Sequence, residues 1–238
     1  MRTGSPSHPE ESGPVDEQFL ADPPLMDARA LAVRDVIVLS GPAARTSQGM
    51  KKHGETDMRL KLLSPGEMSE DQKQTYDESI AGKRGKPPPP MMAWLNSPEM
   101  ARHATRLGGF LRFDTLFPAK LSEIAILVTA RHWSSHYEWY AHKQLALKGG
   151  MDPGIIDDIR DRRTPRFDDP KGQMIHDVAK SLHEGHGLTK TLYDEAVKVL
   201  TVRGLVEIIG LCGYYTLVSM TLNTFEFELP AGEVSELV

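Results

Sequence analysis

The 238-residue sequence is almost without cysteine, and Cys212 is its only thiol. One cysteine excludes an intramolecular disulfide, a Cys-x-x-Cys redox pair and a zinc site made of several thiolates. We therefore expect a cytoplasmic protein in which Cys212 is a small, buried apolar residue.

An excess of positive charge is also lacking, as is a long apolar run. The 28 Lys and Arg residues are outnumbered by 33 Asp and Glu, which gives a net charge of −5. Without a basic face we predict no nucleic-acid partner. The apolar run near the start, residues 33–39, contains Arg34 and Asp35. No run approaches the roughly 20 residues that span a bilayer, so we expect no membrane segment.

Residues 1–57 are rich in Pro, Gly, Ser and charge and show no sustained apolar period. A segment of this composition buries too little apolar surface to fold, so we predict a disordered extension. Within it, the short piece DVIVLS is a candidate strand or docking peptide. The folded domain is predicted to span residues 58–238.

From Ser64 onward the signals are helical, and we predict an all-α fold of about six to eight helices. Ser69 and Gln72 have the spacing of a capping box ahead of a first helix. The run KRGKPPPP, residues 83–90, is predicted to be an extended loop because consecutive prolines do not continue a helix. A second helix is predicted to begin at residues 97–98, with Ser as the cap and Pro in the first turn.

The longest helical stretch covers residues 119–148, and we expect it to break or kink near residues 133–135. Further helices are predicted from residue 152 and over residues 171–184, 189–200 and 202–222. Strand-like alternation is found only in FEFEL, residues 225–229.

The chemistry-bearing residues concentrate in the middle of the longest stretch. Glu138 and His142 are four residues apart, which on a helix places their Cβ atoms about 5–6 Å from each other. A carboxylate there holds the imidazole in one tautomer and raises its pKa, which suits cofactor-free proton transfer at neutral pH. Ser135 falls on the same face, and Trp139 flanks it. The alternative is an ordinary exposed ion pair worth a few tenths of a kcal/mol.

A metal site is the other interpretation of this segment, because His132 and His136 lie close to His142 in the sequence. Their spacing matches no familiar zinc or iron site. We predict no metal and no other cofactor.

Two segments of the sequence resemble the carboxymuconolactone decarboxylase family, whose fold is shared with the alkylhydroperoxidase AhpD. They are LSEIAILVTARHWSSHYEWYAHKQLALKGGM and GLVEIIGLCGYYTLVSMTLNTFEFELP, and the resemblance covers roughly residues 60–230. In the peroxidase branch, a Glu is followed by a Cys-x-x-Cys pair and then by a His four residues after the second Cys. On this chain, these positions carry Glu123, Ser135, Glu138 and His142.

The absence of both sulfurs excludes dithiol peroxidase chemistry, because hydroxyl and carboxylate groups form neither a sulfenate nor a disulfide. What remains is similar to the decarboxylase side of the family. The resemblance implies a carboxy-lyase for a small carboxylated lactone of aromatic-compound breakdown. His142 is then the proton donor, Glu138 its orienting partner and Glu123 a second carboxylate. A hydrolase, dehydratase or isomerase of a related small acid, or a catalytically silent ligand-binding protein, are the alternatives.

Four residues are candidates for binding the carboxylic acid substrate: Ser135, Trp139, Tyr214 and Arg131. The phenol of Tyr214 can donate a hydrogen bond to a carbonyl, and the guanidinium of Arg131 can bind a carboxylate. Core packing and a solvated surface position are the respective alternatives.

The resemblance also implies assembly, since family members form trimers or hexamers with pockets near subunit contacts. We therefore expect a homotrimer or homohexamer. The apolar final helix, Leu205 to Leu222, and the Pro-rich loop agree with this expectation.

Overall fold

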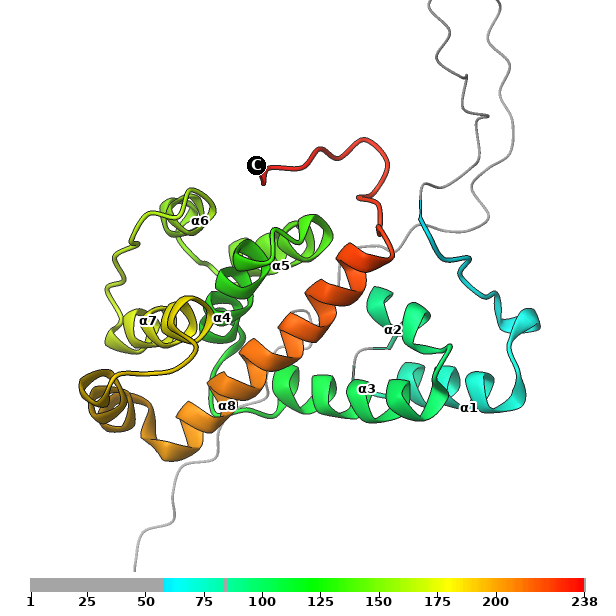
Figure 1. The fold of residues 1–238 in the computed structure, drawn as a ribbon, viewed down its shortest axis with the longest axis horizontal. Coiled ribbons are helices and arrows are strands. Elements are labelled where there is room, and N and C mark those ends of the chain that lie inside the picture. Colours follow the sequence, from blue (N-terminus) through cyan, green and yellow to red (C-terminus); the bar gives the residue numbers. More distant parts are fainter. Residues whose placement is uncertain (1–57, 84, 238) are drawn as a thin grey trace, which may run out of the picture.

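The computed structural model describes residues 58–83 and 85–237, and within them every regular element is helical (Figure 1). The predicted all-α fold is confirmed. The predicted disordered extension, residues 1–57, lies outside the described residues. A short 3-10 turn, η2 (Pro65–Glu67), precedes eight α-helices: α1 (Glu70–Ile80), α2 (Pro89–Trp94), α3 (Pro98–Phe113), α4 (Ala119–His132), α5 (His136–Lys148), α6 (Pro153–Arg160), α7 (Pro170–Gly185) and α8 (Lys190–Thr224).

Helix α4 is the centre of the fold. Every residue from Leu121 to Arg131 is buried, and α4 packs against α5, α7 and α8. A helix that is apolar nearly all round has no face for solvent and is stable only when other helices enclose it. Any polar side chain on α4 is therefore held in a dry environment.

The predicted break near residues 133–135 is confirmed as a tight turn between α4 and α5. Ser134 adopts a left-handed backbone conformation with φ of 44°. The backbone N–H of Ser135 donates to the carbonyl of Ala130 at 2.9 Å, which satisfies a terminal group of α4. The turn folds α5 back along α4, so side chains from the two helices meet.

Helix α8 is two helices joined at Thr201, as the predicted boundary between residues 200 and 202 indicated. Thr201 has φ of 68° and ψ of 166°, outside the helical region. Its hydroxyl accepts a hydrogen bond from the N–H of Gly204 at 3.3 Å and so caps the second part.

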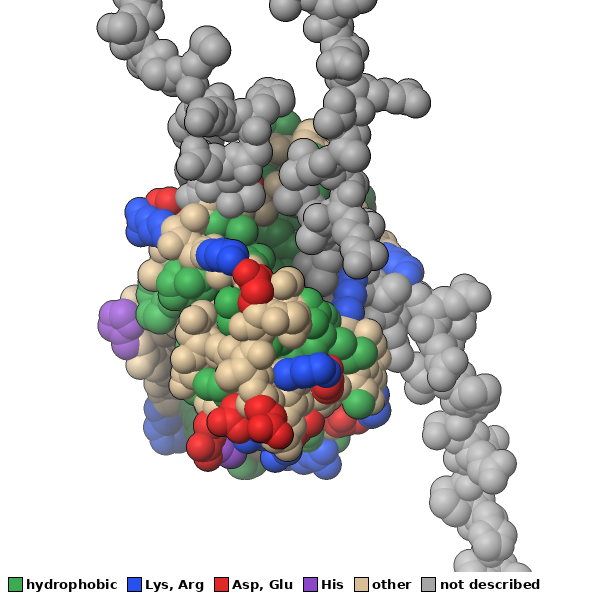
Figure 2. Space-filling model, turned by 90° about the vertical axis from the view of Figure 1, so that its right-hand side faces the viewer, with side chains coloured by type: hydrophobic (Ala, Val, Ile, Leu, Met, Phe, Trp, Pro, Cys, Tyr) green, Lys and Arg blue, Asp and Glu red, His purple; other side chains and the backbone are tan. Residues whose placement is uncertain are grey.

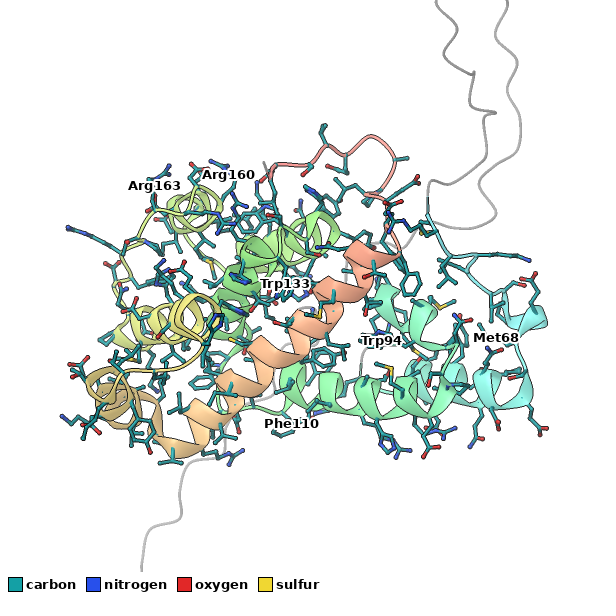
Figure 3. All side chains as sticks on the ribbon, in the orientation of Figure 1. Met68, Trp94, Phe110, Trp133, Arg160 and Arg163 are labelled. Atoms are coloured by element: carbon teal, nitrogen blue, oxygen red, sulfur yellow. The ribbon has the colours of Figure 1, made fainter. Side chains whose placement is uncertain are left out.

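Two tryptophans fix the second part of α8 on its flanks (Figure 3). The indole N–H of Trp94 donates to Thr221 at 2.8 Å, and that of Trp133 donates to Thr216 at 3.2 Å. Because Trp94 belongs to α2 and Trp133 to the α4–α5 turn, α8 is tied to both sides of the molecule.

By length and composition, α8 is apolar enough to cross a membrane. In the structure, 61% of its most apolar window is buried against other helices. That burial is typical of the core helix of a soluble domain.

Two local predictions were wrong. The predicted loop over residues 83–90 contains the start of α2, because Pro89 and Pro90 occupy the first turn, where backbone N–H groups have no helical partner to lose. The FEFEL segment, residues 225–229, forms no strand, since no second strand is present among the described residues to pair with it.

The surface on the right-hand side of Figure 1 carries charges of both signs. Figure 2 shows Lys and Arg side chains interspersed with Asp and Glu and separated by apolar patches. The visible described residues of this face therefore carry charges of both signs.

The crossing of α3 and α8 depends on the absence of a side chain at Gly108. A Cβ at this position would lie 2.1 Å from the hydroxyl oxygen of Tyr214, whereas a Cβ at Gly109 would meet nothing within 4 Å. Overpacking costs ~1–3 kcal/mol, and replacing a helical glycine by alanine gains ~1 kcal/mol. Urea unfolding should therefore show a lower free energy of unfolding for Gly108→Ala and an equal or higher one for Gly109→Ala. Equal effects of the two substitutions would contradict this packing.

Candidate active site

Glu123, Glu138 and His142 meet between α4 and α5. Glu123 lies on α4, and the other two lie one turn apart on α5. The His142 Nδ1–H donates to Glu123 Oε2 at 2.6 Å. On the opposite edge of the ring, Nε2 lies 2.9 Å from Glu138 Oε1, an ion-pair contact without the alignment of a full hydrogen bond. Both nitrogens of the imidazole thus face a carboxylate.

This cluster is buried. Glu123 and Glu138 are each 4% exposed and His142 is 6% exposed, so the alternative of an ordinary solvated ion pair is wrong. Burial removes the solvent screening that weakens surface pairs, and the interactions among these charges are correspondingly strong.

The surroundings hold His142 in its charged form. Burial by itself lowers the pKa of an imidazole, but the negative charges of Glu123 and Glu138 and the contacts that they accept raise the pKa of His142 to about 9. At neutral pH the side chain is an imidazolium, which is a proton donor.

Arg112, from the last turn of α3, extends the cluster. Its Nη1 lies 3.8 Å from Glu123 Oε1, and its side chain is 9% exposed. Two cations and two carboxylates therefore alternate in the order Arg112, Glu123, His142 and Glu138, and their formal charges cancel. Residue spacing gave no signal for this contact, because Arg112 and Glu123 lie on different helices and meet only where α3 approaches α4.

Tyr215, and not the predicted Tyr214, contacts the imidazole. The rings of Tyr215 and His142 meet edge to face, with centroids 4.9 Å apart. Tyr214 packs behind it, edge to face with Tyr215 at 5.3 Å and with Trp94 at 6.2 Å. Neighbouring helical residues point about 100° apart, so the sequence did not show which of the two tyrosines faces the imidazole. The role of Tyr214 in binding a substrate stays a prediction.

Ser135 is the N-cap residue of α5 and precedes Glu138 by three residues. It is 0% exposed, and its hydroxyl has no hydrogen-bond partner among the described residues. A buried hydroxyl without a partner costs roughly 1–3 kcal/mol, which a bound molecule can recover by hydrogen bonding to it.

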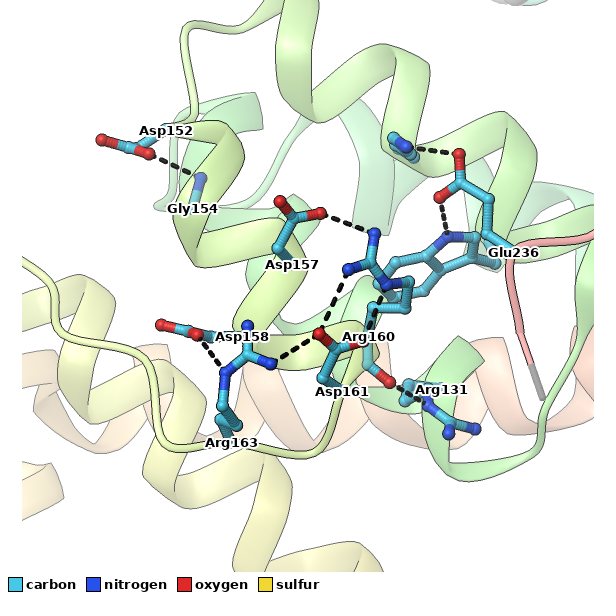
Figure 4. A network of polar contacts seen from close by, with 11 residues as sticks. Arg131, Asp152, Gly154, Asp157, Asp158, Arg160, Asp161, Arg163 and Glu236 are labelled. Carbon is cyan, nitrogen blue, oxygen red and sulfur yellow. Dashed lines mark hydrogen bonds and ion pairs between the residues drawn. The ribbon is translucent and has the colours of Figure 1, made fainter.

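The structure does not bring Arg131 to the cluster. It lies eight residues beyond Glu123 on α4, where its guanidinium donates to the carbonyl of Arg160 (Figure 4). That bond attaches the end of α4 to the end of α6, and a second bond, to the hydroxyl of Ser134, holds the α4–α5 turn. Arg131 therefore connects structural elements, and its role in binding a substrate stays a prediction.

Trp139 is 2% exposed and belongs to the core. Its indole N–H donates to Glu236 Oε2 at 3.3 Å, and Glu236 also pairs with Lys143 (Figure 4). Trp139 therefore packs in the core and anchors the C-terminal segment, and its N–H is already used within the chain.

The histidines that suggested a metal site separate in space. His132 stacks on His183 at 4.8 Å between centroids, and His136 contacts Ser235. In the described part of the chain, no three His, Cys, Asp or Glu side chains are grouped as ligands of a metal ion. Cys212 is buried, and burial raises the pKa of its thiol to about 12, so it supplies no thiolate.

Comparison with models of protein families finds no match, and no curated protein sequence matches. Solved structures do match. A protein of Ralstonia eutropha JMP134, described as an alkylhydroperoxidase AhpD core and an uncharacterized peroxidase-related protein, has a TM-score of 0.62 at 15% identity. The match covers 75% of this chain and 95% of that one.

Two further structures agree. A peroxidase-related protein of Silicibacter sp. TM1040 has a TM-score of 0.61 at 13% identity, with 76% of this chain and 95% of that one covered. The debrominase Bmp8, in complex with 2,3,4-tribromopyrrole, has a TM-score of 0.58 at 13% identity, with coverage of 74% and 95%. At these identities the likeness concerns the fold. The chain has the AhpD-like helical fold that the sequence resemblance implied.

The raised pKa of His142 makes stability depend on pH. Because the folded-state pKa lies near 9 and the ordinary value is 6.5, the stabilisation is complete below about pH 6.5 and is lost as the pH rises through 9. A difference of this size corresponds to about 3 kcal/mol. The free energy of unfolding of the wild type, measured with urea, should fall over this pH interval. The free energy of unfolding of His142→Gln should not show this fall. Retention of the same slope by His142→Gln would contradict the assignment, and the exposed His103→Gln serves as the control.

Proposed function

We propose that this chain is a cofactor-free acid/base enzyme, a carboxy-lyase for a small carboxylated lactone or a related vinylogous β-keto acid. The observation that carries the proposal is the buried imidazolium of His142 between Glu123 and Glu138. A surface histidine is mostly neutral at pH 7, whereas this one keeps a proton available for transfer in a site from which water is excluded.

The proposed reaction needs a proton donor and no electron carrier. When a carboxylate lies two bonds from a carbonyl or its vinylogue, the C–C bond to the carboxylate breaks and its electron pair moves into the conjugated carbonyl. Carbon dioxide leaves, and a dienolate remains. His142 then protonates the dienolate carbon, and one proton taken up from solvent restores the imidazolium. Each turnover therefore consumes one proton and releases one carbon dioxide.

The neighbouring groups have complementary roles in this proposal. Glu123 accepts the Nδ1–H at 2.6 Å and fixes the ring, which leaves the Nε2 edge toward Glu138 for proton delivery. The hydroxyl of Ser135, buried and without a hydrogen-bond partner in the described structure, is positioned one turn from Glu138 to bind a polar group of the substrate. Tyr215 supplies an aromatic wall.

Peroxidase chemistry is not part of the proposal, although two structural neighbours are described as peroxidase-related. By the sequence resemblance, Ser135 and Glu138 stand where the peroxidase branch has its redox cysteines, and the thiol of Cys212 is buried with a raised pKa. These three side chains therefore cannot form the disulfide that dithiol turnover requires.

A catalytically silent ligand-binding protein is the second candidate, and the burial of the cluster favours it. With His142 only 6% exposed, a substrate reaches the imidazole only if surrounding side chains or helices move. The convergence of three titratable side chains within ion-pair distance favours the enzyme. Burying these groups costs desolvation energy, and a protein without catalytic activity would have no use for the arrangement.

Proton NMR of the full chain with 4-carboxymuconolactone and related lactone acids, without metal or reductant, tests the proposal. The wild type should form decarboxylated product, and His142→Gln should reduce the rate by at least ~100-fold, the usual contribution of a general acid. The rate should fall as the pH rises through 9, because the imidazolium is then lost.

His103→Gln is the matched control, since His103 is an exposed residue of α3 that pairs with Glu99 at 3.8 Å. It should turn over substrate as the wild type does. Full activity of a folded His142→Gln variant would contradict the acid/base assignment. Ligand binding without turnover would favour the catalytically silent ligand-binding protein.

A further inference from the structure

A stripe of uncharged residues runs along the outer face of the second part of α8, and we name it the α8 stripe. Its members follow one another in alternating steps of four and three residues: Val202, Val206, Ile209, Gly213, Thr216 and Met220. Val202 is 56% exposed, Val206 62%, Ile209 46% and Met220 45%, whereas Thr216, at the edge of the stripe beside Trp133, is half-buried. In Figure 1, α8 lies across the front of the other helices, and no described helix covers it.

The spacing of the stripe is that of a helix that packs lengthwise against another helix. Alternating steps of four and three keep side chains on one seam, as in coiled coils. The opposite face of α8 packs on α4 and α7 and carries Leu211, Val218 and Leu222 into the core. The helix therefore has one seam used inside the molecule and a second seam facing solvent.

Gly213 opens a gap in the middle of the stripe. It is exposed, and a Cβ built on it would meet nothing within 4 Å. Inside a helix, glycine costs about 1 kcal/mol relative to alanine, so a gap at this position is a local loss of stability. It also lets a side chain from another helix approach the backbone closely.

The stripe is complementary to itself when two copies lie antiparallel. With a twofold axis that crosses the stripe midway between Ile209 and Gly213, Ile209 faces Gly213 of the second copy, Val206 faces Thr216, and Val202 faces Met220. In heptad terms, the a positions are Val206, Gly213 and Met220, and the d positions are Val202, Ile209 and Thr216. Each layer therefore pairs an a position with a d position, as antiparallel pairing requires. The central layer places the large Ile side chain over the gap at Gly213. We propose that α8 forms a twofold contact with α8 of a second copy of this chain.

Charge and size support a second copy as the occupant. The nearest charged residues on α8, Arg203 and Glu207, lie off the stripe and pair with each other at 2.8 Å. A charged partner would therefore find no counter-charge along the seam. The stripe instead exposes four large apolar side chains, those of Val202, Val206, Ile209 and Met220, which a second apolar seam would remove from water.

This geometry restricts the assembly to even numbers. An isologous twofold contact occurs in dimers and in hexamers built from two trimers, but not in a single closed trimer. Of the two assemblies that the resemblance implied, the contact is compatible with the hexamer.

Size-exclusion chromatography with light scattering, run on the full chain at micromolar concentration, measures the particle mass directly. The wild type should have an even number of subunits. Val206→Glu buries an unpaired charge in the seam and should halve the mass, while the helix content by circular dichroism stays unchanged. Val234→Glu is the matched control, because Val234 is 83% exposed on the C-terminal segment. A monomeric or trimeric wild type, or an unchanged mass for Val206→Glu, would overturn the proposal.

A residue swap tests the antiparallel register. Gly213→Ile alone places Ile against Ile in the central layers and should halve the mass. Combining Gly213→Ile with Ile209→Gly restores one Ile and one Gly to each layer and should restore the mass. Assembly of the single variant, or a swap that stays at half mass, would overturn the register.

Discussion

The charge on His142 is the interaction on which this structure depends. It is enclosed by Glu123 and Glu138, and Arg112 neutralises the remaining carboxylate charge. Removing one member of such a buried set leaves an unpaired charge in a dry environment, which costs about 3–5 kcal/mol. Since the members come from α3, α4 and α5, the network fixes how these helices cross, and the α4–α5 turn at Ser134 is what lets them meet.

Helix α8 connects this network to the outer surface. Tyr215 lies against the imidazole on the inner side, and Gly213, two residues earlier, lies in the exposed stripe. The same helix therefore forms one wall of the candidate active site and one face of the proposed contact between copies.

Much of the fold was predictable because it depends on local signals. Turn and cap residues predicted three local features that the structure has: the capping box at Ser69, the break before Ser135 and the division of α8 at Thr201. The convergence of Glu138 and His142 follows from helical spacing alone. The start of α2 was missed because prolines are compatible with a first turn as well as with a loop.

The rest of the site depends on how helices cross, which spacing does not encode. Glu123 was expected from the family pattern, and its distance from His142 along the chain gave no proof of contact. Arg112 reaches the site through the position of α3 against α4, and Tyr215 through the rotation of α8. The contact of Arg131 with the carbonyl of Arg160 was not foreseen, because it depends on how α6 packs at the end of α4.

The most direct test of the account is a nitrogen-15 NMR titration of the His142 ring in the full chain, alongside Glu123→Gln. The account predicts that both ring nitrogens stay protonated through neutral pH and titrate near 9 in the wild type, and at a lower pH in the variant. A wild-type imidazole that titrates at or below its ordinary value of 6.5 would contradict the buried imidazolium and the proton-transfer chemistry built on it.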